Sequence, residues 1–399
     1  MTPILVLTST YPRWQDDTEP AFVRHLCLQL ARAYRPIVLA PHYPGASRHE
    51  VLDGIEVYRF RYFLPFAQRL AYDGGIMTNL ERHPARLLLV PFFLLSQFYW
   101  ILRLCRARQI RLIHAHWLIP QGLLAVLART LGCRRAKILC TAHGGDLWSM
   151  QGGLMNRLKG YVLRRIDHLT VVSRAMRDHL RATGRLPAHT SVQPMGVDLT
   201  GTFTPASATA ARSGLLFVGR LVEKKGVITL LEALALLARN HPDLQLTCIG
   251  DGPERAGLEQ RAAALHIADR VKFRGAVPNH QIPAYLRAAR IAVVPSLVAG
   301  SGDQEGLGLV AVEALGCGCA TVVSDLPALR DVVEDGSNGL VFRAGDAADL
   351  AAKLELLLQD QPLYDRLTAA GRQSVTGKFD WQAVGNGYIE TIADCLGRP

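Results

Sequence analysis

The sequence predicts an α/β fold built from two doubly wound, Rossmann-like domains that face a central crevice. Three observations support this prediction. The chain has 399 residues, which suits two domains of roughly 100 to 200 residues each. Short β-branched apolar runs alternate with longer helical patterns, as in parallel sheets covered by helices on both faces. A polar, turn-rich stretch after residue 194 separates two such halves.

The apolar runs predict six strands in each half. In the first half they lie near residues 4–7, 37–40, 55–60, 112–116, 138–141 and 169–172. In the second half they lie near residues 215–218, 245–249, 271–273, 291–294, 321–323 and 340–342. We therefore assign residues 1–196 to an N-terminal domain and residues 197–379 to a C-terminal domain.

The charge is unevenly distributed along the chain. Residues 1–200 hold 26 Lys and Arg against 12 Asp and Glu, a formal charge of +14, whereas residues 201–399 hold 19 against 22, a formal charge of −3. Such an excess favours an anionic partner, and a merely soluble basic surface is the alternative. Nucleic acid is not expected, because no aromatic stacking platform or known binding module accompanies the charge.

The cysteines and the N-terminus predict a cytoplasmic protein. The eight cysteines form no C-x-x-C pair and no disulfide-like framework, and the N-terminus lacks a signal-peptide pattern. Cys317 and Cys319 form a C-x-C, but no matching His or Cys pair accompanies them, so packing is favoured over metal binding. We predict no metal and no other cofactor.

Residues 87–102 form an uncharged apolar run that is interrupted by Pro91 and falls short of the roughly 20 residues needed to span a bilayer. It suits a core helix or an interfacial helix. Its flanks carry Arg82, Arg86, Arg103, Arg106 and Arg108. Together with the basic first half, this pattern suggests peripheral contact with an anionic membrane, on the inner face of the cell membrane, and a lipid-linked glycan acceptor.

A glycine-bracketed basic turn opens the second half, in the segment VGRLVEKKG over residues 218–226. Arg220 and Lys225 can converge on a diphosphate, while Gly219 and Gly226 let the backbone approach it. Standing alone, the segment would be equally well explained as a solvated basic turn.

The segment EGLGLVAVEA, residues 305–314, runs from a glycine-rich turn into a helix. Backbone NH groups at the start of that helix favour phosphate, and they belong to Gly306, Leu307, Gly308 and Leu309. Glu305 lies in the loop and Glu313 on the helix, about 12 Å apart if fully helical, so the two carboxylates can address different parts of an extended donor. A glycosidase pair and ordinary surface residues are the alternatives.

These segments, together with IGDGP over 249–253, resemble the signature of family 4 glycosyltransferases, which have the two-domain B-type fold. Glu305 and Glu313 match the E-x7-E spacing of that family. Similarity extends to VQPMGVDL, KFRGAVP and the terminal FDWQAV segment, which resembles the helix that crosses back to the first domain. The resemblance covers nearly the whole chain, and its motifs are specific in combination.

The resemblance implies a retaining hexosyltransferase that uses a nucleotide-diphosphate sugar in polysaccharide or glycolipid synthesis. Arg220 and Lys225 would bind the diphosphate, Glu305 the transferred sugar and Glu313 the ribose. The backbone from Arg274 to Val277 would hold the base. Residues 1–196, completed by a C-terminal helix over 380–399, would bind a glycan or lipid-linked acceptor, and residues 197–379 would bind the nucleotide sugar.

The segment CTAHGGD over 140–146 resembles the T-x-H-G segment of the family. His143 is the candidate for contacting the sugar at the reaction centre, although a lone histidine can equally be structural, and Asp146 is expected to orient groups nearby. His114 and His116 alternate along a strand without a third ligand, which favours packing over metal binding. Residues 9–22 replace the Gly-Gly turn that the family commonly has after its first strand.

Catalysis is expected to depend on electrostatic stabilisation of the departing diphosphate by Arg220, Lys225 and backbone NH groups, with no metal and no covalent nucleophile. Two other function classes were weighed. A nicotinamide-dependent oxidoreductase requires G-x-G-x-x-G after an early strand, which residues 4–11 do not offer. A non-catalytic nucleotide-sugar-binding subunit is disfavoured by the intact basic and acidic site residues. The donor base and sugar are left open.

Overall fold

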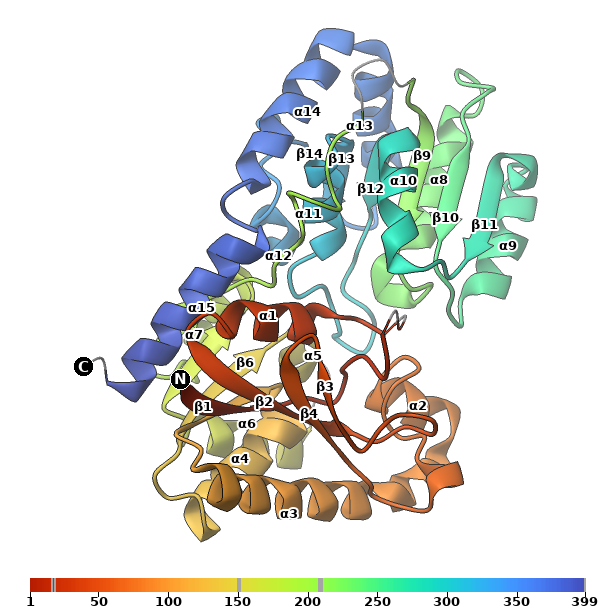
Figure 1. Cartoon of the computed structure of the whole chain (residues 1–399). Coiled ribbons are helices and arrows are strands. Elements are labelled where there is room, and N and C mark those ends of the chain that lie inside the picture. Colours follow the sequence, from red (N-terminus) through yellow and green to blue (C-terminus); the bar gives the residue numbers. More distant parts are fainter. Residues whose placement is uncertain (16, 18, 149–151, 207–210, 398–399) are drawn as a thin grey trace. The chain divides into compact units, whose positions relative to one another are not determined.

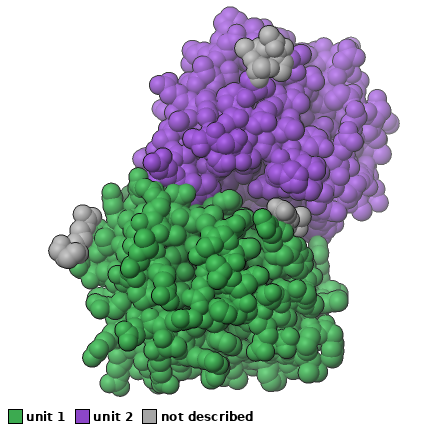
Figure 2. All heavy atoms as spheres, viewed as in Figure 1, with its two compact units in different colours: residues 1–172, 176–196, 384–399 green, residues 173–175, 197–383 purple. Residues whose placement is uncertain are grey.

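The computed structural model of the chain describes residues 1–15, 17, 19–148, 152–206 and 211–397. It divides into two compact units (Figure 2): residues 1–172, 176–196 and 384–399 form unit 1, and residues 173–175 and 197–383 form unit 2. Each unit contains one largely parallel sheet with helices, which confirms the predicted fold class. Residues 16 and 18 of the predicted first loop, and 398–399 of the predicted C-terminal helix, lie outside the described residues.

The sheet of unit 1 has eight strands in the order β3-β4-β2-β1-β5-β6-β7-β8. They are β1 Thr2–Leu7, β2 Tyr34–Pro41, β3 His49–Leu52, β4 Ile55–Phe60, β5 Leu112–His116, β6 Lys137–Ala142, β7 His168–Val171 and β8 Thr190–Val192. All pairs are parallel except β3 with β4. The prediction of six strands was therefore wrong by two. The hairpin turns at Asp53-Gly54, both with positive φ, and β8 has only three residues.

Helices of unit 1 flank this sheet (Figure 1). They are α1 Phe22–Leu30, α2 Ile76–Arg82, α3 Val90–Arg108, α4 Leu123–Leu131, α5 Gly145–Trp148, α6 Gly153–Leu163 and α7 Arg174–Ala182, which belongs to unit 1 from Met176 onward. Helix α15, Trp381–Leu396, belongs to unit 1 from Val384 onward. Tyr388 and Ile392 of α15 are fully buried, and the Tyr388 hydroxyl donates to the carbonyl of Gln193 at 3.2 Å. The end of the chain thus contributes to the core of unit 1.

Helix α3 forms an outer layer of unit 1 (Figure 1) and has two distinct faces. Phe93, Gln97, Ile101 and Leu104 recur at helical spacing and are buried. Four large side chains on the opposite face are exposed, namely Leu88, from the short helical segment Pro84–Leu89, and Phe92, Leu95 and Tyr99. Among the described residues, the helical stretch Pro84–Arg108 is the one long and apolar enough to cross a membrane by length and composition. One face of this helix thus packs in the core of unit 1, and the opposite face is exposed.

The sheet of unit 2 has six parallel strands in the order β11-β10-β9-β12-β13-β14. They are β9 Ser213–Val218, β10 Leu246–Ile249, β11 Val271–Gly275, β12 Ala289–Val294, β13 Ala320–Ser324 and β14 Leu340–Phe342, which confirms all six predicted strands. The helices are α8 Val227–Leu237, α9 Arg255–Ala264, α10 Ile282–Ala288, α11 Leu309–Gly316, α12 Pro327–Arg330, α13 Ala347–Gln359 and α14 Gln361–Val375.

The strand order of unit 2 reverses between β9 and β12. The chain runs outward from β9 through β10 to β11 and then returns to pair β12 with the other side of β9. In open parallel sheets, ligands bind beyond the carboxyl ends of the strands at such a reversal. The loops that follow β9 and β12 are therefore neighbours, although they are about 80 residues apart in sequence.

Candidate active site

The turn after β9 and the loop after β12 are joined by an ion pair. Nζ of Lys225 lies 2.6 Å from Oε2 of Glu305, and the hydroxyl of Ser296 donates to the same oxygen at 3.3 Å. Burial alone would raise the pKa of Glu305, but the Lys225 ammonium outweighs burial and holds the pKa below its ordinary value. Glu305 is therefore a carboxylate at neutral pH, in contact with a largely covered cation.

Three further bonds connect the same two loops. Glu223 accepts a hydrogen bond from the backbone NH of Gly300 at 2.8 Å, and the Lys224 ammonium lies 2.8 Å from Asp303. The NH of Leu297 donates to the carbonyl of Lys224 at 2.8 Å. Sequence reasoning missed these tethers. The sequence signal for these tethers is charge complementarity. Glu223, Lys224 and Lys225 lie in one loop, and Asp303 and Glu305 lie in the other.

Gly226 is required by the packing of the chain itself. Its φ is +62°, and a Cβ at this position would lie 2.0 Å from the carbonyl oxygen of Pro295. At Gly226 the backbone therefore approaches the end of strand β12 closely. The sequence instead predicts that Gly226 lets the backbone approach a diphosphate. Gly219 also has a positive φ, +158°, and a Cβ at this position would lie 3.2 Å from the ring of Phe217, so both features favour glycine.

Helix α11 begins at Leu309, with Gly308 at its N-cap in a left-handed conformation, φ +83°. Gly306, Leu307 and Gly308 are buried. No acidic side chain lies in the first turn of α11, so the positive end of the helix dipole is not neutralised locally. A helix start of this kind favours an anion, and the binding of phosphate by its NH groups stays a prediction.

Glu313 lies in the middle of α11 and is half-buried. Burial raises its pKa to about 8, an effect that the charge of Lys225 partly opposes. Glu305 and Glu313 thus differ in protonation near neutral pH, because one is paired with a lysine and the other is desolvated. The opposite pKa shifts of the two carboxyl groups favour different roles for Glu305 and Glu313 over an equivalent acid and base pair.

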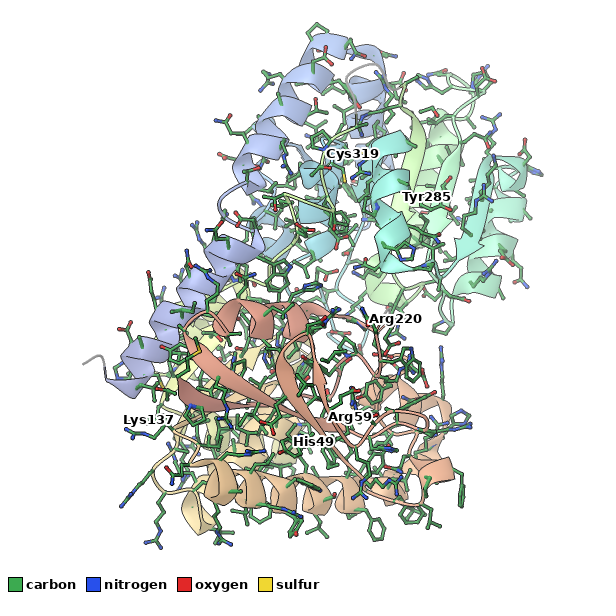
Figure 3. All side chains as sticks on the ribbon, viewed as in Figure 1. His49, Arg59, Lys137, Arg220, Tyr285 and Cys319 are labelled. Atoms are coloured by element: carbon green, nitrogen blue, oxygen red, sulfur yellow. The ribbon has the colours of Figure 1, made fainter. Side chains whose placement is uncertain are left out.

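Arg220 lies in the turn directly after β9 and is exposed (Figure 3). The turn is fixed by the NH of Leu221, which donates to the carbonyl of Asp251 at 3.0 Å. Arg274 is exposed in β11, and Val277 follows that strand. The backbone there is joined to β10 because the NH of Gly250 donates to the carbonyl of Gly275 at 2.8 Å. All of these residues lie at the carboxyl ends of the unit 2 strands.

In unit 1, His143 follows β6 and forms a hydrogen bond to a second histidine. Its Nε2 lies 2.9 Å from Nδ1 of His116, the last residue of β5. The rings of Phe22 and Trp117 cover the His143 ring, with centroid distances of 5.1 and 4.9 Å. Burial, together with the charge of His114, lowers the pKa of His143 to about 3. The imidazole is therefore neutral at physiological pH.

Asp146 fixes the backbone around His143. One of its carboxylate oxygens accepts from the NH groups of His143 and Gly144 at 3.0 and 3.2 Å, and the other accepts from the NH of Leu118 at 2.9 Å. Burial raises the pKa of this carboxyl, while the backbone bonds from Leu118 and His143 and the charge of Lys159 oppose the rise. Asp146 is thus a positioning residue that joins the loop after β6 to the loop after β5.

His114 and His116 are both fully buried on the same side of β5. His114 is bonded to the hydroxyl of Thr141 at 2.8 Å, and Thr141 is bonded to Thr170 at 2.6 Å. These residues form a polar network beneath His143. No group of three or more His, Cys, Asp or Glu side chains among the described residues could hold a metal ion. All eight cysteines, including Cys317 and Cys319, are free thiols.

The loop that replaces the Gly-Gly turn is organised around Arg13, which sequence reasoning did not single out. Arg13 is nearly buried and pairs with Asp17 at 2.7 Å and with Asp73 at 3.3 Å. Its guanidinium also lies over the ring of Tyr43, 4.5 Å from the centroid. These contacts of Arg13 join its backbone segment after β1 to Asp17, Asp73 and Tyr43.

Two family matches cover both units. Residues 21–200 match the family described as Glycosyltransferase Family 4, and residues 211–374 match Glycosyl transferases group 1. A GDP-mannose-dependent alpha-(1-6)-phosphatidylinositol monomannoside mannosyltransferase of Mycolicibacterium smegmatis is 28% identical over 406 residues, covering 98% of each chain. Its namesake in Mycobacterium tuberculosis is 31% identical over 281 residues, 66% of this chain and 71% of that protein.

Solved structures share the fold over the full length. Sucrose-phosphate synthase from Thermosynechococcus elongatus has a TM-score of 0.82 at 22% identity, covering 100% of both chains. HepE from Anabaena, in complex with UDP and glucose, has a TM-score of 0.73 at 19% identity, covering 99% of this chain and 100% of that one. At these identities the likeness concerns the fold alone.

The two-unit fold and the family matches over both units define a glycosyltransferase that uses a nucleotide-sugar donor. The chain belongs to glycosyltransferase family 4. The family resemblance of its motifs is thereby confirmed, and neither the oxidoreductase nor the binding-subunit alternative is favoured.

Proposed function

We propose that this protein is a retaining, metal-independent hexosyltransferase that moves a sugar from a nucleotide-diphosphate donor to a glycan or lipid-linked acceptor. The observation that carries the proposal is the Lys225–Glu305 ion pair, which lies directly before the glycine-rich start of α11. A lysine and helix NH groups supply the positive charge that a departing diphosphate requires, without a metal ion.

Unit 2 would hold the donor. Lys225, Arg220 and the NH groups from Gly306 to Leu309 would stabilise the negative charge that develops on the diphosphate as the glycosidic bond breaks. Glu305 would accept hydrogen bonds from sugar hydroxyls while it keeps Lys225 in place. Glu313 would bind the ribose hydroxyls, and the backbone from Arg274 to Val277 would hold the base.

Unit 1 would hold the acceptor. His143 is neutral, so it would act on the sugar as a hydrogen-bonding group and not as a cation. Retention of configuration requires the acceptor hydroxyl to attack carbon 1 from the face that the diphosphate leaves. The C–O bond to the diphosphate breaks, the bond to the acceptor oxygen forms, and the acceptor proton passes to a diphosphate oxygen.

We further propose that the protein works in the cytoplasm at the inner face of an anionic membrane, with a lipid-linked acceptor in polysaccharide or glycolipid synthesis. Eight free cysteines suit a reducing compartment. Leu88, Phe92, Leu95 and Tyr99 form an exposed apolar stripe on unit 1, whose half of the chain carries a formal charge of +14. The names of the mannosyltransferase relatives include a phosphatidylinositol acceptor.

A donor panel tests the enzymatic proposal. Purified protein is incubated with GDP-mannose, UDP-glucose, UDP-galactose and ADP-glucose, with and without EDTA, and nucleotide release and the anomeric configuration of the product are measured by NMR. We expect one donor to be used, with retention and without an effect of EDTA. Release that EDTA abolishes contradicts metal independence, and an inverted product contradicts retention.

Matched variants test the residue assignment. Lys225→Ala should lower transfer by at least ~100-fold, the scale of removing one donor group at a developing oxyanion. Lys353→Ala is the control. Lys353 lies on α13 in unit 2, is also partly covered, and forms an ion pair with Asp335 at 3.3 Å. Equal activity in the two variants would contradict the role of Lys225.

A further inference from the structure

A hollow of about 980 Å³ opens at the amino-terminal edge of the unit 1 sheet. Its walls come from the starts of β1 and β2, the segments just before β5 and β6, and the ends of α3 and α15. His143 follows β6, whereas Arg134 and Arg135 precede it, so the six-residue strand separates them by about 20 Å. The hollow is therefore distinct from the candidate active site.

Arginine dominates the lining. Arg106, Arg108, Arg111, Arg134 and Arg135 all line the hollow, and no Asp or Glu is among the described residues that do. Of these five arginines, Arg108 alone forms an ion pair with a described residue, and its partner is Glu56. The side chains of the other four arginines form no ion pair or hydrogen bond with any described residue. Lys137, at the start of β6, lies next along the same edge (Figure 3).

A purely structural explanation accounts for part of this charge. Helices α3, α4 and α15 all end near the hollow, and each helix C-terminus carries about half a negative charge, which arginines stabilise. Three such ends and Glu56 together supply about −2.5 against five guanidinium groups. A surplus of about 2.5 positive charges remains, so the protein offsets only part of the mutual repulsion of the arginines.

We propose that this hollow binds a ligand that carries two or more phosphate groups. Guanidinium groups bind phosphate in bidentate fashion, and five of them from three chain segments can surround a multivalent anion. The volume suits a small-molecule ligand. Apolar side chains such as Ile110 and Leu396 also line the hollow, which provides room for a less polar body beside the phosphates.

A phosphorylated lipid headgroup and a free soluble polyphosphate share this chemistry. The exposed stripe of α3 continues from Tyr99 to Arg103 and Arg106 at helical spacing, so the apolar face leads to the hollow. The experiment therefore has one arm for each source. It is carried out in the Lys225→Ala background, which weakens the donor site, and the matched control variants account for the binding that remains there.

In the first arm, inorganic tripolyphosphate is titrated into the full-length protein by calorimetry. Arg134→Glu/Arg135→Glu should weaken binding by at least tenfold, because both side chains are exposed and have no ion-pair or hydrogen-bond partner among the described residues. Arg157→Glu on α6 combined with Arg164→Glu directly after that helix is the control, with the same change of charge on exposed arginines of the same unit. Arg111→Glu serves as a second test variant, and thermal melts check that each variant is folded.

In the second arm, vesicles of phosphatidylcholine with one fifth phosphatidylinositol 4-phosphate are sedimented with each variant. Loss of vesicle binding in Arg134→Glu/Arg135→Glu alone, with competition by tripolyphosphate, identifies a headgroup as the ligand. Loss of tripolyphosphate binding with unchanged vesicle binding identifies a soluble ligand. If the test and control variants behave alike in both arms, the proposal is overturned, whatever the donor assays show.

Discussion

Nζ of Lys225 and Oε2 of Glu305 are 2.6 Å apart across two loops that belong to different strands of the unit 2 sheet. Lys225→Ala leaves the Glu305 carboxylate covered and without its cation, so we expect a loss of stability of about 1–3 kcal/mol in addition to the loss of transfer. The double variant Lys225→Ala/Glu305→Gln should recover much of that stability and none of the activity. Urea unfolding and transfer assays separate the two effects. A double variant as unstable as Lys225→Ala would contradict this explanation.

The pKa of Glu313, about 8, predicts a specific dependence of stability on pH. The folded-state pKa lies above the unfolded value, so this carboxyl stabilises the fold below pH 4.5, and that stabilisation is lost as pH rises through 8. Glu313→Gln should therefore gain on wild type by on the order of 4 kcal/mol between pH 5 and pH 9. Urea unfolding across this range measures the difference. Glu259→Gln on α9 is the control and should show no such gain.

His143 should remain neutral at pH 5. Its pKa of about 3 results mainly from burial beneath aromatic rings, among them Phe22 at a centroid distance of 5.1 Å. Nitrogen NMR of the imidazole distinguishes the neutral from the charged ring directly. Phe22→Ala should admit water and shift the His143 pKa upward, toward the ordinary histidine value near 6.5. A wild-type ring that becomes protonated near pH 6 would contradict the burial argument.

Two glycines provide a matched steric test. Gly226→Ala places a Cβ 2.0 Å from the Pro295 carbonyl oxygen at a positive φ, so the turn that carries Lys225 must shift. We expect a loss of stability of at least ~1 kcal/mol and a large drop in transfer. Gly257→Ala, in α9 with open space around it, should raise stability by ~0.5–1 kcal/mol. Differential scanning calorimetry compares the two, and equal melting temperatures would contradict the steric account.

The exposed stripe of α3 should mediate binding to membranes. Leu95 and Leu154 are each 67% exposed and lie in unit 1, on α3 and α6. Leu95→Asp should reduce co-sedimentation with vesicles that contain one fifth phosphatidylglycerol, because it places a charge in the apolar face. Leu154→Asp has the same chemistry elsewhere and should bind like wild type. Binding that neither substitution nor high salt weakens would contradict the assignment of this face.

Much of the fold follows from local pattern. All six strands of unit 2 were predicted, because buried parallel strands are continuous β-branched runs that stand out between helices. In unit 1, β3 was missed because its side chains are mostly exposed, so it lacks an apolar run. The Asp53-Gly54 pair before β4 is a recognised hairpin signal and could have identified it. Strand β8, with three half-buried residues, offers no comparable signal.

The candidate site was predictable where it depends on motifs and not where it depends on register. Glu305, Glu313 and Lys225 were found from their segments, whose spacing is local. The bond between His116 and His143 depends on the pairing of β5 with β6, which places residues 27 positions apart in contact. Likewise, the tether from Glu223 to Gly300 depends on β9 lying beside β12. Such contacts are tertiary and leave little trace in a single sequence.

Unit 1 is discontinuous along the chain, because residues 384–399 return to it after the whole of unit 2. During synthesis, the strands β1 to β8 leave the ribosome long before the helix that carries Tyr388 and Ile392. Until α15 has been synthesised, the apolar surface of unit 1 that Tyr388 and Ile392 cover is exposed to solvent. Unit 2, in contrast, can fold as soon as its own strands emerge. A premature stop shortly before residue 384 would thus leave unit 2 complete and unit 1 exposed to aggregation or proteolysis.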